Sequence, residues 1–285
     1  MTFRNDDSSK FPLPKVDVVS KFLFGTPRNA HLLQAFLSAV LKKPVKKLEI
    51  RHFNDTHLEP HRVNDKNPIV DVKATLMDGT EIHIEVQLHF HKYLLERVTF
   101  YNAKIVSSQL ARGENYGELR KVITILLSND ELFRESPAYH HTFSLYDPVH
   151  QVKLTNMVEF HTLEFNKVPE ESDGSDLHHW MSFFKSESRE ELLMAASKDE
   201  MIAKAYEELE RLGQDREAML AYERRLIEIR DKDAIRETAL EEGEANNKLR
   251  NAENLLDILD DETIADKIGL PLEIVQELRK LAELK

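Results

Sequence analysis

The two stretches that decide the fold are PIVDVKATL at residues 68–76 and EIHIEVQLHF at residues 81–90. In both stretches apolar and polar side chains alternate, which is the pattern of a β-strand with one buried face. Met77, Asp78 and Gly79 lie between them and suit a three-residue hairpin loop with the glycine in the left-handed conformation. The sequence therefore predicts a β-hairpin.

The length of the loop decides which residues of the hairpin face one another. A three-residue loop pairs Val72 with Ile84 and sets Asp71 directly opposite Glu85, so that the apolar residues share one face. A two-residue loop would pair Asp71 with Val86 and set polar side chains against the apolar face. Because burial of one face specifies the register of a strand pair, we expect the first arrangement.

Two carboxylates directly opposite one another on a sheet repel, so the expected pair of Asp71 and Glu85 needs compensation. A divalent cation such as Mg²⁺ or Mn²⁺ would supply it, because such ions take oxygen ligands. The alternative is an exposed sheet face with solvated acids, on which Lys73 and His83 neutralise the charge. The residues of the hairpin leave both interpretations open.

The order of an aspartate in PIVD at residues 68–71, a glycine turn and Glu85-Val86-Gln87 resembles the PD-(D/E)XK nuclease superfamily. The closer resemblance is to its Rpn-type recombination-promoting nucleases, often labelled transposases, which carry glutamine where most of the superfamily has lysine. The resemblance runs from about residue 16 to the end of the chain and includes DVVSKFLFG at residues 17–25, Arg97, Tyr101, GENY at residues 113–116 and EEG at residues 241–243. Ser20 departs from the pattern, in which phenylalanine precedes the lysine.

This resemblance implies an α/β fold: a restriction-endonuclease-like α/β/α core with a mixed sheet, followed by an α-helical C-terminal extension. It implies a Mg²⁺-dependent DNA endonuclease, with Mn²⁺ able to substitute, that promotes recombination or mobile-element exchange. Asp71, Glu85 and Gln87 would be catalytic, and Asp17, Asp71 and Glu85 would bind the metal. Taken alone, Asp17 would equally suit the N-cap of a helix at residues 18–24.

Four side chains are candidates for contacts with DNA phosphates: Lys21, Arg97, Tyr101 and Lys104. Lys21 lies one helical turn after Asp17, and the other three recur at helical spacing on one face of the helix expected after the hairpin. If that face turned toward the core instead, Tyr101 would be a packing residue and Arg97 would lie at the surface.

The charge of the 285-residue chain is unevenly distributed. Its net charge is −12, but residues 1–130 hold 19 Lys and Arg against 15 Asp and Glu, whereas residues 131–285 hold 20 against 36. A mildly basic first half can bind phosphates.

The absence of cysteine excludes disulfides and thiolate metal sites, and no apolar run approaches membrane-spanning length. The polar N-terminus lacks a signal core, so we expect a cytoplasmic protein that does not bind a membrane.

The sequence predicts four segments: a frayed N-terminus at residues 1–14, a nuclease-like domain at 15–185, a charged helical arm at 186–254 and a small helix-turn-helix-like tail at 255–285. The arm could form a homo-oligomer. In the tail, Asp260 or Asp261 caps a helix that ends at Gly269. Two other functions remain open: a catalytically inactive scaffold that binds DNA or protein, and an oligomeric interaction protein.

Overall fold

The computed structural model describes residues 11–51, 72–88 and 92–283 of the chain. The chain divides into two compact units, Met1–Glu223 and Arg224–Lys285. The division falls inside the long helix α7 (Arg216–Glu253). Within the described residues, no helix combines the length and the apolar content that crossing a membrane requires.

The first unit is built on a six-stranded mixed sheet in the order β1-β2-β3-β4-β8-β5. Strands β3, β4 and β8 are parallel and central, whereas β1 and β2, β2 and β3, and β5 and β8 are antiparallel pairs. The strands of the sheet are β1 (Leu48–Arg51), β2 (Val72–Leu76), β3 (Glu81–Gln87), β4 (Val122–Ser128), β5 (His140–Ser144) and β8 (Val158–Glu164). A small separate hairpin, β6 (Tyr146–Asp147) and β7 (Val152–Lys153), was not expected from the sequence.

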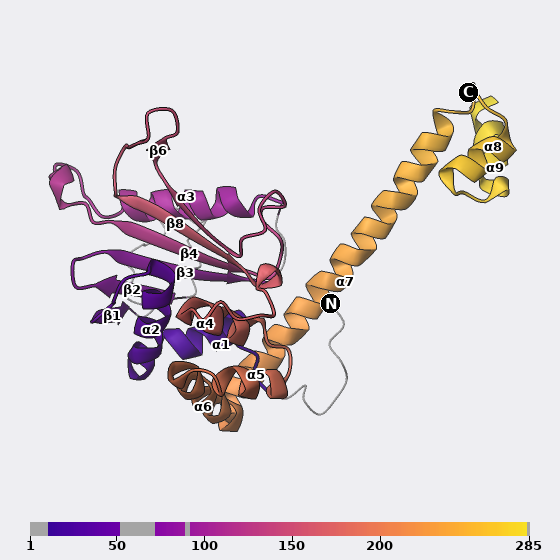
Figure 1. Cartoon of the computed structure of the whole chain (residues 1–285). Coiled ribbons are helices and arrows are strands. Elements are labelled where there is room, and N and C mark those ends of the chain that lie inside the picture. The colour runs from indigo at the N-terminus through magenta and orange to yellow at the C-terminus, as the bar shows by residue number, and fades with distance from the viewer. Residues whose placement is uncertain (1–10, 52–71, 89–91, 284–285) are drawn as a thin grey trace. The chain divides into compact units, whose positions relative to one another are not determined.

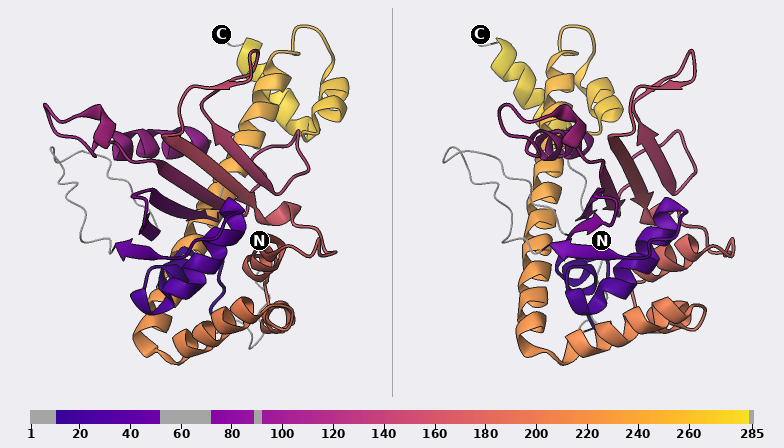
Figure 2. Two further views of the ribbon diagram at one scale, coloured as in Figure 1. Left: turned by 60° about the vertical axis from the view of Figure 1, so that its left-hand side comes forward. Right: turned by 90° about the vertical axis from the view of Figure 1, so that its left-hand side faces the viewer.

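Helices cover both faces of this sheet (Figure 1). α1 (Asp17–Phe24), α2 (Ala30–Leu41) and α4 (Asp176–Lys185) lie on one face, and α3 (Leu94–Ser107) lies on the other, as the further views in Figure 2 also show. Central parallel strands are normally buried on both faces, and every residue of β4 is buried. The predicted α/β/α core with a mixed sheet is confirmed.

An aromatic cluster holds α1, α2 and α4 together beneath the sheet. Phe24 of α1 stacks on Phe36 of α2 with 5.0 Å between ring centroids. Trp180 and Phe184 of α4 contact both of these rings at centroid distances of 5.7–5.8 Å. Such aromatic contacts stabilise beyond the area they bury, so α4 is fixed to the N-terminal helices.

Two further helices belong to the first unit, α5 (Arg189–Ala196) and α6 (Glu200–Gln214), which the start of α7 follows. α6 packs against α1, α2 and α4 and buries Ile202, Ala205 and Leu209. The unit therefore continues beyond residue 185, where the sequence places the end of the nuclease-like domain. The functional division between that domain and the helical arm stays a prediction.

The second unit has its own small core around α8 (Asp261–Ile268) and α9 (Leu272–Glu283). Asp260 caps α8 by accepting the N–H of Thr263 at 2.9 Å, and Gly269 ends it with a φ of 69°. The predicted boundaries of this helix are confirmed. Arg279, one of the few cations of the tail, donates to Asp261 at 2.5 Å, so its charge is used within the unit.

Candidate active site

The hairpin of β2 and β3 adopts the register that its alternating pattern predicts. Val72 pairs with Ile84, as the three-residue loop requires. Gly79 takes up the left-handed conformation, with a φ of 82°, which a residue with a side chain rarely adopts. Asp71 lies outside the described residues, so its pairing with Glu85 stays a prediction.

Glu85 lies on the face of the sheet that α3 covers, and it is buried, with 8% of its surface exposed. Arg97 at the end of the first turn of α3 donates from Nη2 to Glu85 Oε1 at 2.6 Å. A charge-assisted bond of this length is strong and offsets the desolvation of the carboxylate. The alternative of a solvated acidic face is therefore wrong for Glu85, because a helix cation rather than water neutralises it.

Gln87 shares the same guanidinium nitrogen. Arg97 Nη2 donates to Gln87 Oε1 at 2.8 Å. Because a guanidinium has no acceptor, the oxygen of the amide must face it and the Nε2 group must point elsewhere. Gln87 is thus oriented with its Nε2 group away from Arg97, and its neutral amide cannot take a proton from water.

Apolar packing and one buried polar contact fix α3 over the sheet and so position Arg97. Val98 packs on Leu126 of β4. Asn102 donates from Nδ2 to Thr124 Oγ1 at 2.9 Å, and both residues are buried. A satisfied buried polar pair specifies one alignment of helix and sheet, which sets the position of the guanidinium.

The other predicted residues on α3 are Tyr101 and Lys104, both half-buried. The ring centroids of Tyr101 and Phe100 are 5.8 Å apart. The structure thus joins Arg97 directly to Glu85 and Gln87. The role of Tyr101 and Lys104 in phosphate binding stays a prediction.

Asp17 and Lys21 lie on α1, which packs against β2 and β3. Val16 is the N-cap of this helix and Asp17 is its first residue, so the capping alternative for Asp17 is wrong. Asp17 Oδ1 accepts the N–H of Val18 at 3.0 Å. Because α1 and α3 cover opposite faces, Asp17 can approach Glu85 only around the ends of the strands. Metal binding by Asp17 and phosphate contact by Lys21 stay predictions.

The carboxyl ends of β3, β4 and β8 meet at one edge of the sheet, because the three strands are parallel. In this edge Gln87 pairs with Ser128, and Ser128 pairs with Glu164. Ligands of open α/β sheets bind outside the carboxyl ends of the strands. Gln87 therefore lies in a row of polar side chains at the edge where a substrate would be bound.

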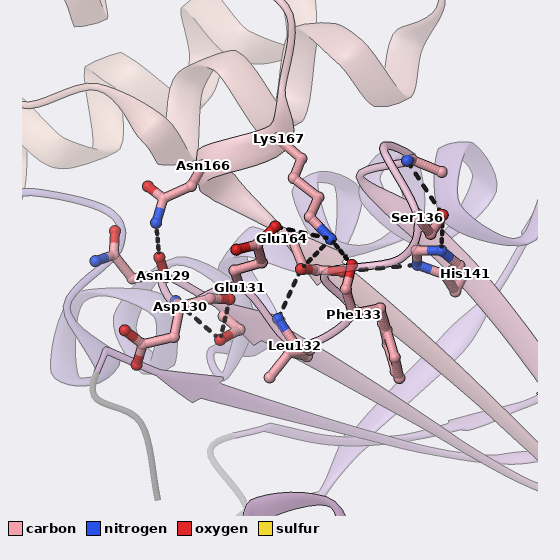
Figure 3. A network of polar contacts seen from close by, with 12 residues as sticks. Asn129, Asp130, Glu131, Leu132, Phe133, Ser136, His141, Glu164, Asn166 and Lys167 are labelled. Carbon is pink, nitrogen blue, oxygen red and sulfur yellow. Dashed lines mark hydrogen bonds and ion pairs between the residues drawn. The ribbon is translucent and has the colours of Figure 1, made fainter.

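Glu164 is fully buried and anchors the segment that follows β4 (Figure 3). Its Oε2 accepts the N–H of Leu132 at 2.7 Å and pairs with Lys167 Nζ at 2.8 Å. Lys167 also donates to the carbonyl oxygen of Phe133. These contacts tie Leu132 and Phe133 to the end of β8. The sequence interpretation missed Glu164, although an acid that ends an apolar strand with a lysine three residues later is a usable signal.

A second series of polar side chains in contact runs from β5 through β8 to Lys121, the residue before β4. His140 Nε2 and His161 Nδ1 are 2.9 Å apart, and His161 Nε2 lies 3.0 Å from Glu159 Oε1. Lys121 donates to the other oxygen of Glu159 at 2.8 Å. Burial and the neighbouring His161 lower the pKa of His140 to about 4. Burial also lowers the pKa of His161, although Glu159 opposes this effect. Both imidazoles are therefore neutral near pH 7 and hold β5 to β8.

Comparison with known proteins identifies one family. Residues 14–239 match the family described as PD-(D/E)XK nuclease family transposase. The matched segment contains the whole described sheet, α1 and α3, and it agrees with the resemblance carried by the hairpin. No curated protein and no solved structure matches the chain.

Proposed function

Because this chain belongs to the PD-(D/E)XK nuclease family transposases, we propose that it is a metal-dependent endonuclease that hydrolyses phosphodiester bonds of DNA. The observation that carries the proposal is the buried carboxylate of Glu85 near the carboxyl end of β3, with Gln87 beside it. A buried acid is costly unless it is paired, and such groups concentrate at functional sites.

The donor set proposed for the metal is Glu85 with Asp71 and Asp17, the two ligands expected from the sequence. Carboxylate oxygens suit Mg²⁺, with Mn²⁺ as a substitute, because both are hard cations. When bound, such an ion polarises the scissile phosphate and lowers the pKa of the attacking water. The chemistry of the donors therefore fits the metal that the family implies.

Gln87 and Arg97 would bind the phosphate. Gln87 Nε2 would donate to a phosphate oxygen, since its Oε1 is turned toward Arg97. Gln87 is neutral and cannot supply the positive charge that lysine has at this position in most of the superfamily. Arg97 would supply that charge by exchanging its bond with Glu85 for a bond with a phosphate oxygen.

Contacts farther along the DNA are proposed for Lys21, Tyr101 and Lys104, which would hold phosphates without reading sequence. The excess of Lys and Arg lies in residues 1–130, which supports DNA binding by this part of the chain. Cleavage would promote recombination or mobile-element exchange in the cytoplasm, and the helical arm at residues 186–254 would form a homo-oligomer.

Cleavage of supercoiled plasmid tests the proposal. The wild-type protein should cut with Mg²⁺ or Mn²⁺ and should not cut in EDTA. Asp71→Asn and Glu85→Gln should each slow cleavage by about a thousandfold, as expected for loss of a metal ligand. Glu49→Gln is the matched control, because Glu49 is an exposed glutamate on β1. Equal cutting by wild type and Glu85→Gln would assign the activity to another site or to a contaminant.

A catalytically inactive scaffold is the second candidate, and the bond between Arg97 and Glu85 favours it. A guanidinium on a carboxylate competes with a metal ion for the same oxygen. A scaffold would bind DNA equally well in EDTA and in Mg²⁺ and would cut with neither. Gel-shift and cleavage assays on one preparation therefore distinguish the two functions.

A further inference from the structure

Three metal-ligating side chains converge where the first turn of α4 meets the start of α6. Asp176 and His179 lie on α4, and Asp199 immediately precedes α6. One ligand atom from each of the three lies within 4.8 Å of the others. The spacing of Asp176 and His179 places both side chains on one face of the helix.

Hydrogen bonds within the protein explain only part of this arrangement. His179 Nδ1 is buried and has no hydrogen-bond partner among the described residues. It lies 3.5 Å from Asp199 Oδ2, which is long for a hydrogen bond. Asp199 uses its other oxygen, Oδ1, to cap α6 by accepting the N–H groups of Met201 and Ile202 at 2.7 and 3.0 Å. Its Oδ2 is thereby held toward His179.

A pair of the same residue types elsewhere shows what a simple ion pair looks like in this protein. Asp147 and His150 have the same spacing in the chain as Asp176 and His179. His150 Nδ1 and Asp147 Oδ2 approach to 2.7 Å. They bond directly, whereas His179 Nδ1 and Asp199 Oδ2 are 3.5 Å apart, which is farther than in the direct pair.

The separation matches the geometry of a transition-metal site. Two donors bound tetrahedrally to Zn²⁺ at its usual bond lengths lie about 3.3 Å apart, close to the distance between His179 and Asp199. Imidazole with carboxylates suits Zn²⁺, whereas Mg²⁺ prefers oxygen ligands alone. Asp176 is exposed, so rotation of its side chain can bring the third donor into range.

We propose that Asp176, His179 and Asp199 bind Zn²⁺, at a site separate from the nuclease carboxylates. The ion joins the N-terminal ends of α4 and α6, two helices that already pack together in the first unit. α4 carries the aromatic cluster under the sheet. The ion thereby stabilises the attachment of α6 to the core, and it plays no part in cleavage.

Calorimetric titration of Zn²⁺ into tag-free, EDTA-treated and dialysed protein tests the site, with thermal unfolding as a second readout. We expect one Zn²⁺ per chain and a higher unfolding midpoint with Zn²⁺. His179→Gln and Asp176→Asn should each weaken binding by about tenfold or more and remove the rise in the midpoint. His150→Gln and Glu85→Gln should bind Zn²⁺ like wild type.

Each result decides the matter. Because Asp176 is exposed, Asp176→Asn should fold, so that variant keeps the test valid even if His179→Gln unfolds. Absence of Zn²⁺ binding by wild type, or undiminished binding by a folded Asp176→Asn variant, would overturn the proposal. Loss of binding in His150→Gln or Glu85→Gln would place the ion elsewhere and would overturn it as well.

Discussion

Two buried glutamates near the carboxyl ends of parallel strands are neutralised in different ways. The side chain of Glu164 is fully buried, and that of its partner Lys167 is 9% exposed. The side chain of Glu85 is 10% exposed, but that of its partner Arg97 is 32% exposed. An enclosed pair cannot exchange partners, whereas a cation that reaches solvent can turn to a ligand. We infer that Glu164 maintains the architecture and that Glu85 serves the reaction.

The largest expected difference between the two glutamates is in cleavage. Glu85→Gln should slow plasmid cutting by about a thousandfold, or about 4 kcal/mol of transition-state stabilisation. Glu164→Gln should cut at close to the wild-type rate when rates are normalised to the folded fraction measured by circular dichroism. Equal losses of cleavage rate in the two variants would show that Glu85 and Glu164 do not differ in their role in the reaction.

The free energy of unfolding should depend more on the pairing of Glu164 than on that of Glu85. Lys167→Met leaves Glu164 buried without its cation, which should lower the free energy of unfolding by about 3 kcal/mol or more, measured by urea denaturation. Lys204→Met is the matched control, because Lys204 pairs with Glu200 at 2.7 Å on an exposed helix face. The control should lose less than about 1 kcal/mol. Similar losses in both variants would contradict the assignment of Glu164.

A smaller loss of unfolding free energy should follow from replacing Arg97, the cation that can turn from Glu85 to a ligand. Arg97→Gln removes a charged donor from Glu85 and should cost about 1.5–3 kcal/mol of unfolding free energy in EDTA. Mn²⁺ should stabilise this variant more than wild type, because the guanidinium no longer competes for the carboxylate. Thermal unfolding with and without Mn²⁺ checks this. Arg225→Gln, which breaks a surface pair with Glu228, controls for general loss of charge. If Mn²⁺ stabilised Arg97→Gln and wild type equally, Arg97 would not compete with the metal for Glu85.

The last effect appears only as the solution is acidified, and it concerns the far edge of the sheet. The pKa of His140 in the folded protein is about 4, against 6.5 in the unfolded chain. The unfolded state therefore takes up the proton first, so stability is complete above pH 6.5 and falls as the pH drops toward 4. His140→Asn should show a shallower fall in urea denaturation over this range. An unchanged pH dependence in His140→Asn, matching that of the control His150→Asn, would show that His140 is not responsible.

Local patterns predicted the hairpin and the boundaries of α8 well, because each depends on neighbouring residues. The alternation around Val72 and Ile84 set the register, and Gly79 and Gly269 marked turns that require a positive φ. The attachment of α6 to the core also had a local signal, since Ile202, Ala205 and Leu209 recur at helical spacing within a charge-rich stretch.

Local sequence patterns could not predict the contacts between segments that lie far apart in the chain. The row from Gln87 through Ser128 to Glu164 depends on the order of three parallel strands, and no local pattern specifies that order. The bond from Arg97 to Glu85 depends on the placement of α3, which Asn102 fixes from beneath the helix. The sequence therefore named Glu85, Gln87 and Arg97 as candidates, but it did not predict the hydrogen bonds that join them.

Calorimetric titration of Mn²⁺ tests the central claim, that Glu85 binds the metal of the reaction. The titration belongs in an Asp176→Asn background, so that the proposed zinc site does not contribute. We expect Glu85→Gln to weaken Mn²⁺ binding by about tenfold or more and Glu164→Gln to leave it unchanged. Undiminished Mn²⁺ binding by a folded Glu85→Gln protein would show that Glu85 is not a ligand of this metal.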